Sequence, residues 1–333
     1  MRHGLLLVGE GSSIREMVDL SQAAEAAGMD SVYCVEGYRS AFVPLAAIAA
    51  ATRRVRIGPY VANAYGRSPF LTAMSAIDLD ELSGGRLVLG VGSGNRHINE
   101  DFQGIPHERP LRKLAEYVEL LRLVFRTPKG GKVSYEGEVH RMRWRRSVPP
   151  LRPKIPVWLA AIFPKTVEVA ARVADGVALG VLFSPEYVRD VIRPAAGAAA
   201  ARAGRDPAEL EFPMGALVAV DGDRERARRA IRRTICGFFH PLPHPYYDFL
   251  LREQGYSKVA DAAARLVPEG RIEAAVDAID DEVVDRLALA GSAAACARRL
   301  ADYEGVVDEV IYLNVAEGDA AQGCRGIFEI RRS

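Results

Sequence analysis

The glycines of the run RLVLGVGSGNRHINEDF (86–102) have the spacing most suggestive of a binding site. Gly90, Gly92 and Gly94 alternate at the end of an apolar stretch, and a polar segment without hydrophobic rhythm follows. A dinucleotide fingerprint requires G-x-G-x-x-G, but Asn95 stands where the third glycine belongs. The phosphate-loop pattern G-x-x-x-x-G-K-[ST] is also absent. The spacing therefore argues against both nucleotide interpretations.

Two interpretations of these glycines remain open, and the residues at the ends of other predicted strands help to weigh the two. The glycines either relieve crowding at the rim of a barrel or let a planar ring approach the backbone at its C-terminal mouth. Glu36 ends the run SVYCVE, and Asn63 follows the run RVRIGPYVA. A carboxyl group in an apolar mouth has a raised pKa and can donate or accept a proton. For Glu36 the alternative is a structural carboxylate at a strand end.

Short apolar runs alternate with longer Ala- and Leu-rich helical patterns along the chain. The predicted strands are 4–9, 31–36, 54–62, 86–91, 154–160, 175–181, 212–220 and 308–315. Ser12 or Ser13 is predicted to cap the helix after the first strand, and Gly28 to end it. Apolar strands separated by helices indicate a parallel sheet covered on both faces. Eight such strands in 333 residues favour an α/β fold of the (β/α)8 TIM-barrel class.

Two insertions interrupt this alternation. Residues 127–153 are predicted to form a β-hairpin followed by a proline-rich return. Residues 236–290 are rich in helical pattern and lie between the seventh and eighth predicted strands. We therefore expect one domain, 1–333, that carries both insertions.

Composition and charge exclude several classes of function. The formal net charge of +1 gives no general attraction to nucleic acid or to anionic membranes. No segment approaches the length of a membrane span. The four cysteines lack C-x-x-C spacing, which favours reduced thiols in a cytoplasmic protein. The six histidines show no spacing typical of metal ligands, so no metal is expected.

Two segments carry a family resemblance. GPYVANAYGRSPFLTAMSAIDLDELSGGRLVLGVGSGN (58–95), followed by RPLRKLAEYVELLRLVF (109–125), resembles the bacterial luciferase-like superfamily. Within it, the chain is most similar to the branch that uses the deazaflavin F420, particularly methylenetetrahydromethanopterin reductase. The similarity continues to DEVVDRLALAGSAAACARRL (281–300), so it covers nearly the whole chain. It implies a TIM barrel, a homodimer, and F420 as cofactor, with FMN as the alternative.

The resemblance also implies where the cofactor lies. A non-prolyl cis bond between Tyr60 and Val61 would form a bulge behind the central ring, and a phosphate would meet backbone N–H groups at a helix start. The implied cofactor contacts are Tyr60, Val61, Ala62, Asn63, Ser93, Gly94, Asn95, Ala160, Ala161, Ile162, Phe163, Gly180, Val181 and Leu182. For Asn63, a hydrogen bond to the ring and a turn-stabilising role are both open.

The implied chemistry is hydride transfer between C5 of the deazaflavin and a small organic substrate. Glu36 and Tyr38 are the candidate catalytic residues, because Gly37 and Asn95 stand where relatives often carry a histidine and an acid. An amide cannot supply a proton at ordinary pH. The alternatives are an FMN-dependent monooxygenase and a non-catalytic relative that binds cofactor. His97 and His107 are further candidates in the loop 97–108, with ordinary surface positions as the alternative.

Overall fold

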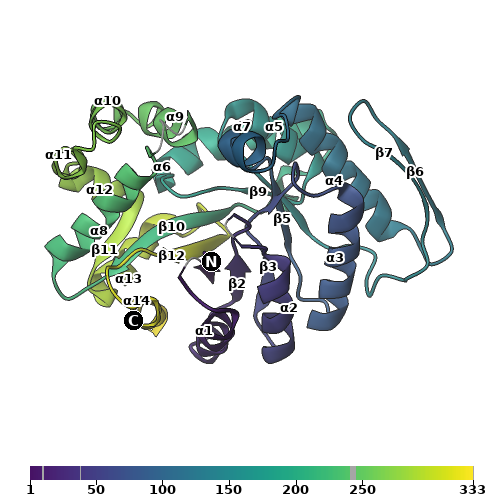
Figure 1. Cartoon of the computed structure of the whole chain (residues 1–333), viewed down its shortest axis with the longest axis horizontal. Coiled ribbons are helices and arrows are strands. Elements are labelled where there is room, and N and C mark those ends of the chain that lie inside the picture. The colour runs from purple at the N-terminus through teal and green to yellow at the C-terminus, as the bar shows by residue number, and fades with distance from the viewer. Residues whose placement is uncertain (10, 38, 241–244, 333) are drawn as a thin grey trace. The chain divides into compact units, whose positions relative to one another are not determined.

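Figure 1 shows the computed structural model of the chain, which describes residues 1–9, 11–37, 39–240 and 245–332. The chain divides into two compact units. The N-terminal unit comprises Gly4–Ala178 and Pro194–Phe212, and the C-terminal unit comprises Met1–His3, Leu179–Arg193 and Pro213–Ser333. In both units helices alternate with parallel strands, as the sequence predicts.

Parallel strands form the core of the N-terminal unit, in the orders β1–β2–β3 and β4–β5–β8–β9. Leu5, Val32 and Ile57 stand opposite one another on the first three strands and are fully buried. Aliphatic residues at these positions remove apolar surface from water, which stabilises the sheet. The bounds are β1 (Arg2–Leu7), β2 (Ser31–Cys34), β3 (Arg56–Pro59), β4 (Ala62–Asn63), β5 (Leu89–Gly92), β8 (Val157–Ala160) and β9 (Gly176–Ala178).

Helices of this unit begin and end at residues suited to those positions. Ser13 caps α1 in a reciprocal hydrogen-bond pair with Glu16, and Gly28 follows the helix with a φ of +82°, which confirms both predictions. Ser68 caps α3, and Gly84 ends it. The bounds are α1 (Ile14–Ala26), α2 (Phe42–Ala51), α3 (Pro69–Ser83), η1 (Ile98–Phe102), α4 (Pro110–Arg126), α5 (Pro164–Val173), α7 (Arg193–Arg202) and η3 (Pro207–Glu209).

An antiparallel hairpin lies within 127–153, the segment for which the sequence predicts one. It consists of β6 (Lys132–Glu136) and β7 (Arg141–Arg145), beside α4 in Figure 1. Glu116 of α4 fixes the hairpin turn, because its buried carboxylate accepts backbone N–H groups of Glu138, Val139 and His140 at 2.8–2.9 Å. A Cβ on Gly137 would lie 2.3 Å from Oε2 of Glu116, so glycine is required at that turn.

A buried arginine holds the start of the return segment. Arg146 is fully buried, and its guanidinium donates to the carbonyl oxygens of Val124, Phe125 and Thr127 at the end of α4. Its Nε also donates to the carbonyl oxygen of Val148 at 2.8 Å. The last carbonyls of a helix have no partner within the helix, so Arg146 satisfies acceptors that burial would otherwise leave unpaired.

The C-terminal unit is built around β10 (Pro213–Val220), which pairs in parallel with β11 (Ala288–Gly291) and β12 (Glu309–Asn314). Its other elements are the short helices α6 (Pro185–Tyr187) and η2 (Val188–Ile192), and then α8 (Arg224–Gly237), α9 (Pro245–Glu253), α10 (Ser257–Leu266), α11 (Ile272–Asp277), α12 (Asp281–Leu287), α13 (Ala293–Arg299), η4 (Leu300–Tyr303) and α14 (Ala320–Arg332). Thus α9 to α12 occupy most of the segment 236–290.

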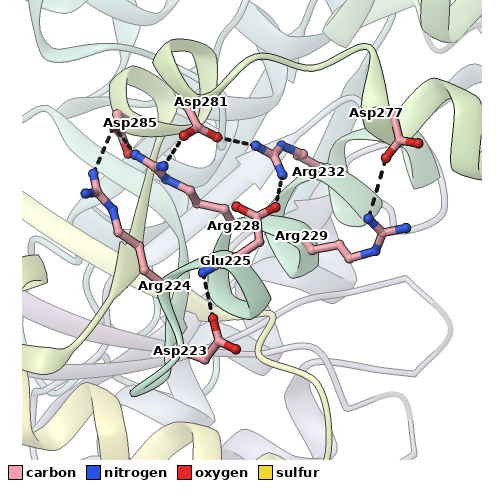
Figure 2. Close-up of polar contacts among 9 residues, drawn as sticks. All are labelled: Asp223, Arg224, Glu225, Arg228, Arg229, Arg232, Asp277, Asp281 and Asp285. Carbon is pink, nitrogen blue, oxygen red and sulfur yellow. Dashed lines mark hydrogen bonds and ion pairs between the residues drawn. The ribbon is translucent and has the colours of Figure 1, made fainter.

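Ion pairs join α8 to α11 and α12, as Figure 2 shows. Arg228, whose side chain is 9% exposed, pairs with both Asp281 and Asp285 of α12. Arg232, 11% exposed, pairs with Asp281 and with Glu225 of its own helix. Further pairs are Arg224–Asp285, Arg229–Asp277, Arg229–Glu273 and Arg233–Glu273. Two clusters of ion pairs therefore hold α11 and α12 against α8, one around Asp281 and Asp285 and the other around Arg229 and Glu273.

Two elements differ from the sequence prediction. The single strand expected at 54–62 is interrupted, so that β3 ends at Pro59 and β4 begins at Ala62. The end of the segment 236–290 was expected to be helical, but Ala288–Gly291 form β11. The run ALAG consists of small residues, and a run this short does not distinguish strand from helix by periodicity. These residues form a strand because their backbone pairs with β10.

The described residues include no helix long and apolar enough to span a membrane. All four cysteines are buried and free.

We expect Glu116→Met to lower the free energy of unfolding by about 2–4 kcal/mol, because three backbone donors lose a charged acceptor. Chemical denaturation followed by circular dichroism measures this change. Glu119→Met, on the exposed face of α4, is the matched control, since Glu119 accepts one side-chain hydrogen bond from Tyr135. Equal stability of the two variants would show that Glu116 does not fix the hairpin.

Candidate active site

Strand β5 approaches the bulge Tyr60–Val61 closely, and its glycines make this approach possible. The Tyr60–Val61 peptide bond is cis, as the resemblance implies. A Cβ on Gly90 would lie 2.4 Å from the carbonyl oxygen of Pro59, and one on Gly92 would lie 2.6 Å from Cγ2 of Val61. Packing against the bulge therefore requires glycine at both positions, and for them it favours the crowding interpretation.

The loop after β5 holds the next predicted cofactor contacts. Gly94 has a φ of +62°, in the left-handed region that favours glycine, and a Cβ there would lie 2.7 Å from Nδ2 of Asn63. The Ser93 hydroxyl donates to the carbonyl oxygen of Gly94 at 3.2 Å. The half-buried side chain of Asn95 has no hydrogen-bond partner among the described residues. Its carboxamide is therefore available to a ligand.

Glu36 lies just after β2 and binds Asn63, the last residue of β4. Its Oε2 accepts the backbone N–H of Asn63 at 3.0 Å, and its Oε1 lies 3.7 Å from Nη1 of Arg67. The Arg67 guanidinium also lies 4.3 Å from the centre of the Phe42 ring. The Glu36 carboxylate is 14% exposed, and both of its partners are donors. This environment suits a fixed anion that holds the β3–β4 segment in place.

Asn63 stabilises the turn between β4 and α3. Its Oδ1 accepts the backbone N–H groups of Tyr65 and Gly66 at 2.8 and 3.3 Å, and its Nδ2 donates to Oδ1 of Asn99 at 2.8 Å. Asn99 is fully buried in η1 and donates in turn to the carbonyl oxygen of Ser93 at 2.8 Å. The contact between the two side-chain amides therefore joins β4 to the loop after β5. The bonds that Oδ1 accepts favour the turn-stabilising interpretation of Asn63.

His107 closes this network in its neutral form. Its Nδ1 lies 3.0 Å from Nδ2 of Asn99, which donates, and its ring stacks on Tyr65 with centroids 4.5 Å apart. Burial lowers the pKa of His107, and the charges of Arg96 and Lys113 lower it further, while the charge of Glu100 acts in the opposite direction. Burial also lowers the pKa of Lys113, whose ammonium lies 4.1 Å from the centre of the Tyr65 ring. His97, by contrast, pairs with Asp101 on the exposed surface.

The end of β8 and the start of α5 hold another predicted group, Ala160 to Phe163. Ala161 donates its backbone N–H to the carbonyl oxygen of Ala178. The N–H of Ile162 has no acceptor among the described residues, and Pro164 occupies the first helical position, as predicted. No side chain caps this helix start at Phe163. Backbone donors at an uncapped helix start suit an anion.

The remaining predicted contacts lie in the C-terminal unit, at Gly180, Val181 and Leu182. A Cβ on Gly180 would meet no atom within 4 Å. Leu182 is fully buried and has a φ of +69°. Its carbonyl oxygen accepts a hydrogen bond from Nε2 of Gln254 at 2.8 Å.

Tyr38 lies outside the described residues. Asn99, Arg67 and Gln254 were not found from the sequence, because their partners are distant along the chain and no motif marks them. The described part of the chain contains no group of three His, Cys, Asp or Glu side chains arranged to hold a metal.

The lowered pKa of His107 predicts a loss of stability in acid. In the unfolded chain the imidazole has its ordinary pKa near 6.5, so below that value the unfolded state binds more protons than the folded state. The stabilisation of the folded state by the neutral His107 is complete above pH 6.5 and is lost as the pH falls towards the pKa that His107 has in the folded state. We expect His107→Gln to flatten the decline of unfolding free energy between about pH 7 and 5. NMR titration of His107 checks the assignment, and a midpoint at or above 6.5 would contradict it.

Comparisons with known proteins extend these observations. The chain matches the family described as luciferase-like monooxygenase over residues 1–309. It is 29% identical over 273 residues to 5,10-methylenetetrahydromethanopterin reductase of Archaeoglobus fulgidus, covering 81% of this chain and 80% of that protein. It is 30% identical over 243 residues to F420-dependent glucose-6-phosphate dehydrogenase of Nakamurella multipartita, covering 70% of this chain and 71% of that protein.

A solved structure gives the fold. The coenzyme F420-dependent tetrahydromethanopterin reductase of Methanopyrus kandleri is similar with a TM-score of 0.82 and 22% identity, covering 98% of this chain and 97% of that chain. This likeness confirms the predicted α/β fold of the TIM-barrel class. The match over residues 1–309 shows that the chain belongs to the luciferase-like monooxygenase family.

Proposed function

We propose that this protein is an F420-dependent oxidoreductase that transfers a hydride between the deazaflavin and a small organic substrate. The observation that carries the proposal is the hydrogen-bond network of Glu36, Asn63 and Asn99, which holds β4 against the loop after β5 that contains Asn95. Two relatives whose names specify a methanopterin reductase and an F420-dependent dehydrogenase support the choice of cofactor and reaction class.

The residues present suit such a cofactor. We propose that Tyr60 to Asn63 back the ring, and that Ser93, Gly94 and Asn95 line its edge. The N–H of Ile162, at the uncapped start of α5, suits the phosphate, with Ala160, Ala161 and Phe163 around it. In the C-terminal unit, Gly180, Val181 and Leu182 are proposed separately as contacts of the phosphoribityl side. When bound, the deazaflavin supplies the carbon that carries the hydride.

The chain's own contribution is orientation, exclusion of water and charge. We propose that Glu36 is the carboxylate that accepts or returns the proton that accompanies hydride transfer, and that Tyr38 assists it. The hydrogen bond from Asn63 holds Oε2 of Glu36, and the ion pair with Arg67 holds Oε1. The same bonds give Glu36 a structural role, so the test must separate charge from position.

The remaining expectations follow from the resemblance. We propose a single domain over residues 1–333 in a cytoplasmic enzyme, acting on a small molecule. A homodimer is proposed because α2 and α3 expose apolar side chains, with Val43 60% exposed and Leu71 and Leu82 about half exposed.

We expect the purified protein to bind F420 at least about tenfold more tightly than FMN. The reason is that relatives named as a methylenetetrahydromethanopterin reductase and an F420-dependent dehydrogenase are similar to this chain over most of its length. Titration followed by cofactor fluorescence measures both dissociation constants. Tighter binding of FMN, with oxygen consumed when the flavin is reduced, would favour the monooxygenase alternative instead.

We expect Glu36→Gln to lower turnover about 10²-fold or more, the scale for losing general acid–base help. Glutamine retains an acceptor for the N–H of Asn63 but removes the charge, so cofactor affinity should change little. Arg67→Gln is the comparison variant, since it removes the ion pair at Oε1 and keeps both the carboxylate and its hydrogen bond from the N–H of Asn63. Wild-type turnover of Glu36→Gln across the pH range would assign Glu36 to structure alone.

A further inference from the structure

The loop after β9 contains a backbone conformation that leucine rarely adopts. Leu182 has a φ of +69° although it carries a branched side chain, and that side chain is fully buried. Positive φ places Cβ of an L-residue too close to its own backbone, so the conformation persists only where the surroundings impose it. Some contact must therefore hold Leu182.

The side-chain amide of Gln254 provides that contact. Its Nε2 donates to the carbonyl oxygen of Leu182 at 2.8 Å, and its Oε1 accepts the backbone N–H of Ser184 at 2.8 Å. One planar amide thus spans the loop and binds it on both sides of Phe183. A second hydrogen of Nε2 goes to the carbonyl oxygen of Leu250 at 2.9 Å, which fixes the amide's orientation.

The position of Gln254 is set by the end of α9. Gly255 has a φ of +86°, and Tyr256 donates its backbone N–H to the carbonyl oxygen of Leu251 at 2.8 Å, so the helix stops at a defined residue. Leu250 and Leu251 are fully buried and seat α9. The following helices lead to α11 and α12, which the ion pairs of Figure 2 fix to α8.

We infer that Gln254 is a positioning residue for cofactor binding: it holds the loop Gly180–Ser184 in the conformation that the cofactor contacts. The inference rests on the proposed function, in which Gly180, Val181 and Leu182 contact the phosphoribityl side. Through this amide the seating of the helical segment α9–α12 determines the shape of the loop. The segment therefore acts on cofactor binding through the loop.

The first experiment uses Gln254→Met, which keeps the length of the side chain and removes its hydrogen bonds. In the protein without cofactor, hydrogen exchange at the Ser184 amide should become at least about tenfold faster. The dissociation constant for F420, measured by fluorescence, should rise about tenfold, with kcat at saturating F420 unchanged. Arg252→Met is the matched control, because it breaks exposed ion pairs to Asp248 and Asp261 without touching the loop.

A second pair of variants separates positioning from general loosening. Leu182→Gly and Leu182→Ala both truncate the buried side chain, but only glycine removes the cost of positive φ. Adding Gln254→Met should raise the F420 dissociation constant further in the alanine background and change it less than about threefold in the glycine background. Equal effects in the two backgrounds would overturn the inference.

The outcomes distinguish this inference from the proposed function. If the wild type binds F420 and Gln254→Met leaves both the dissociation constant and Ser184 exchange unchanged, the inference is wrong and the proposed function stands. If the wild type binds no F420, the proposed function fails. Faster hydrogen exchange at the Ser184 amide in Gln254→Met would then still support the claim that Gln254 holds the loop. An unchanged exchange rate would overturn that claim.

Discussion

The close contact between the bulge and β5 is the constraint on which the rest of the candidate site depends. Val61 occupies space beside Gly90 and Gly92 that any side chain on those residues would fill. Once the bulge is seated there, Asn63 lies where its backbone N–H reaches Glu36 and its side chain reaches Asn99. The polar network is therefore a consequence of packing between two strands.

At several places in this chain a charged side chain binds backbone groups of another segment. Glu116 accepts three N–H groups of the hairpin turn, and Arg146 donates to carbonyls at the end of α4. Arg86 does the same for carbonyls of Ala49 and Thr52 at the end of α2. Charge-assisted hydrogen bonds of this kind are stronger than neutral ones, and they connect elements whose backbone groups would otherwise be buried without partners.

The sequence predicts elements whose signals are local. The apolar runs of β1 and β2, the cap at Ser13 and the stop at Gly28 depend on neighbouring residues alone, and the structure confirms them. The family resemblance supplied the cis bond at Tyr60, which no periodicity reveals. The β-strand character of the run ALAG could not be predicted, because it follows from pairing with a strand about seventy residues earlier.

The side-chain partners within the site could not be predicted for the same reason. Glu36 meets a backbone N–H 27 residues away, and Gln254 meets one 70 residues away. Asn99 lies in an irregular helix, where a polar residue usually faces water, yet it is fully buried. Long-range contacts of this kind depend on the assembled sheet.

The charged residues that join α8 to α12 are regularly spaced, and this spacing affects how the two helices can align. Arg224, Arg228 and Arg232 recur every four residues, and so do Asp281 and Asp285 on the facing helix (Figure 2). Sliding α12 by one turn would exchange partners and keep most opposite charges adjacent. The ion pairs therefore attract the two helices without defining their alignment. The alignment must therefore come from the packing of apolar side chains, and each helix has a fully buried one, Ile231 on α8 and Val284 on α12.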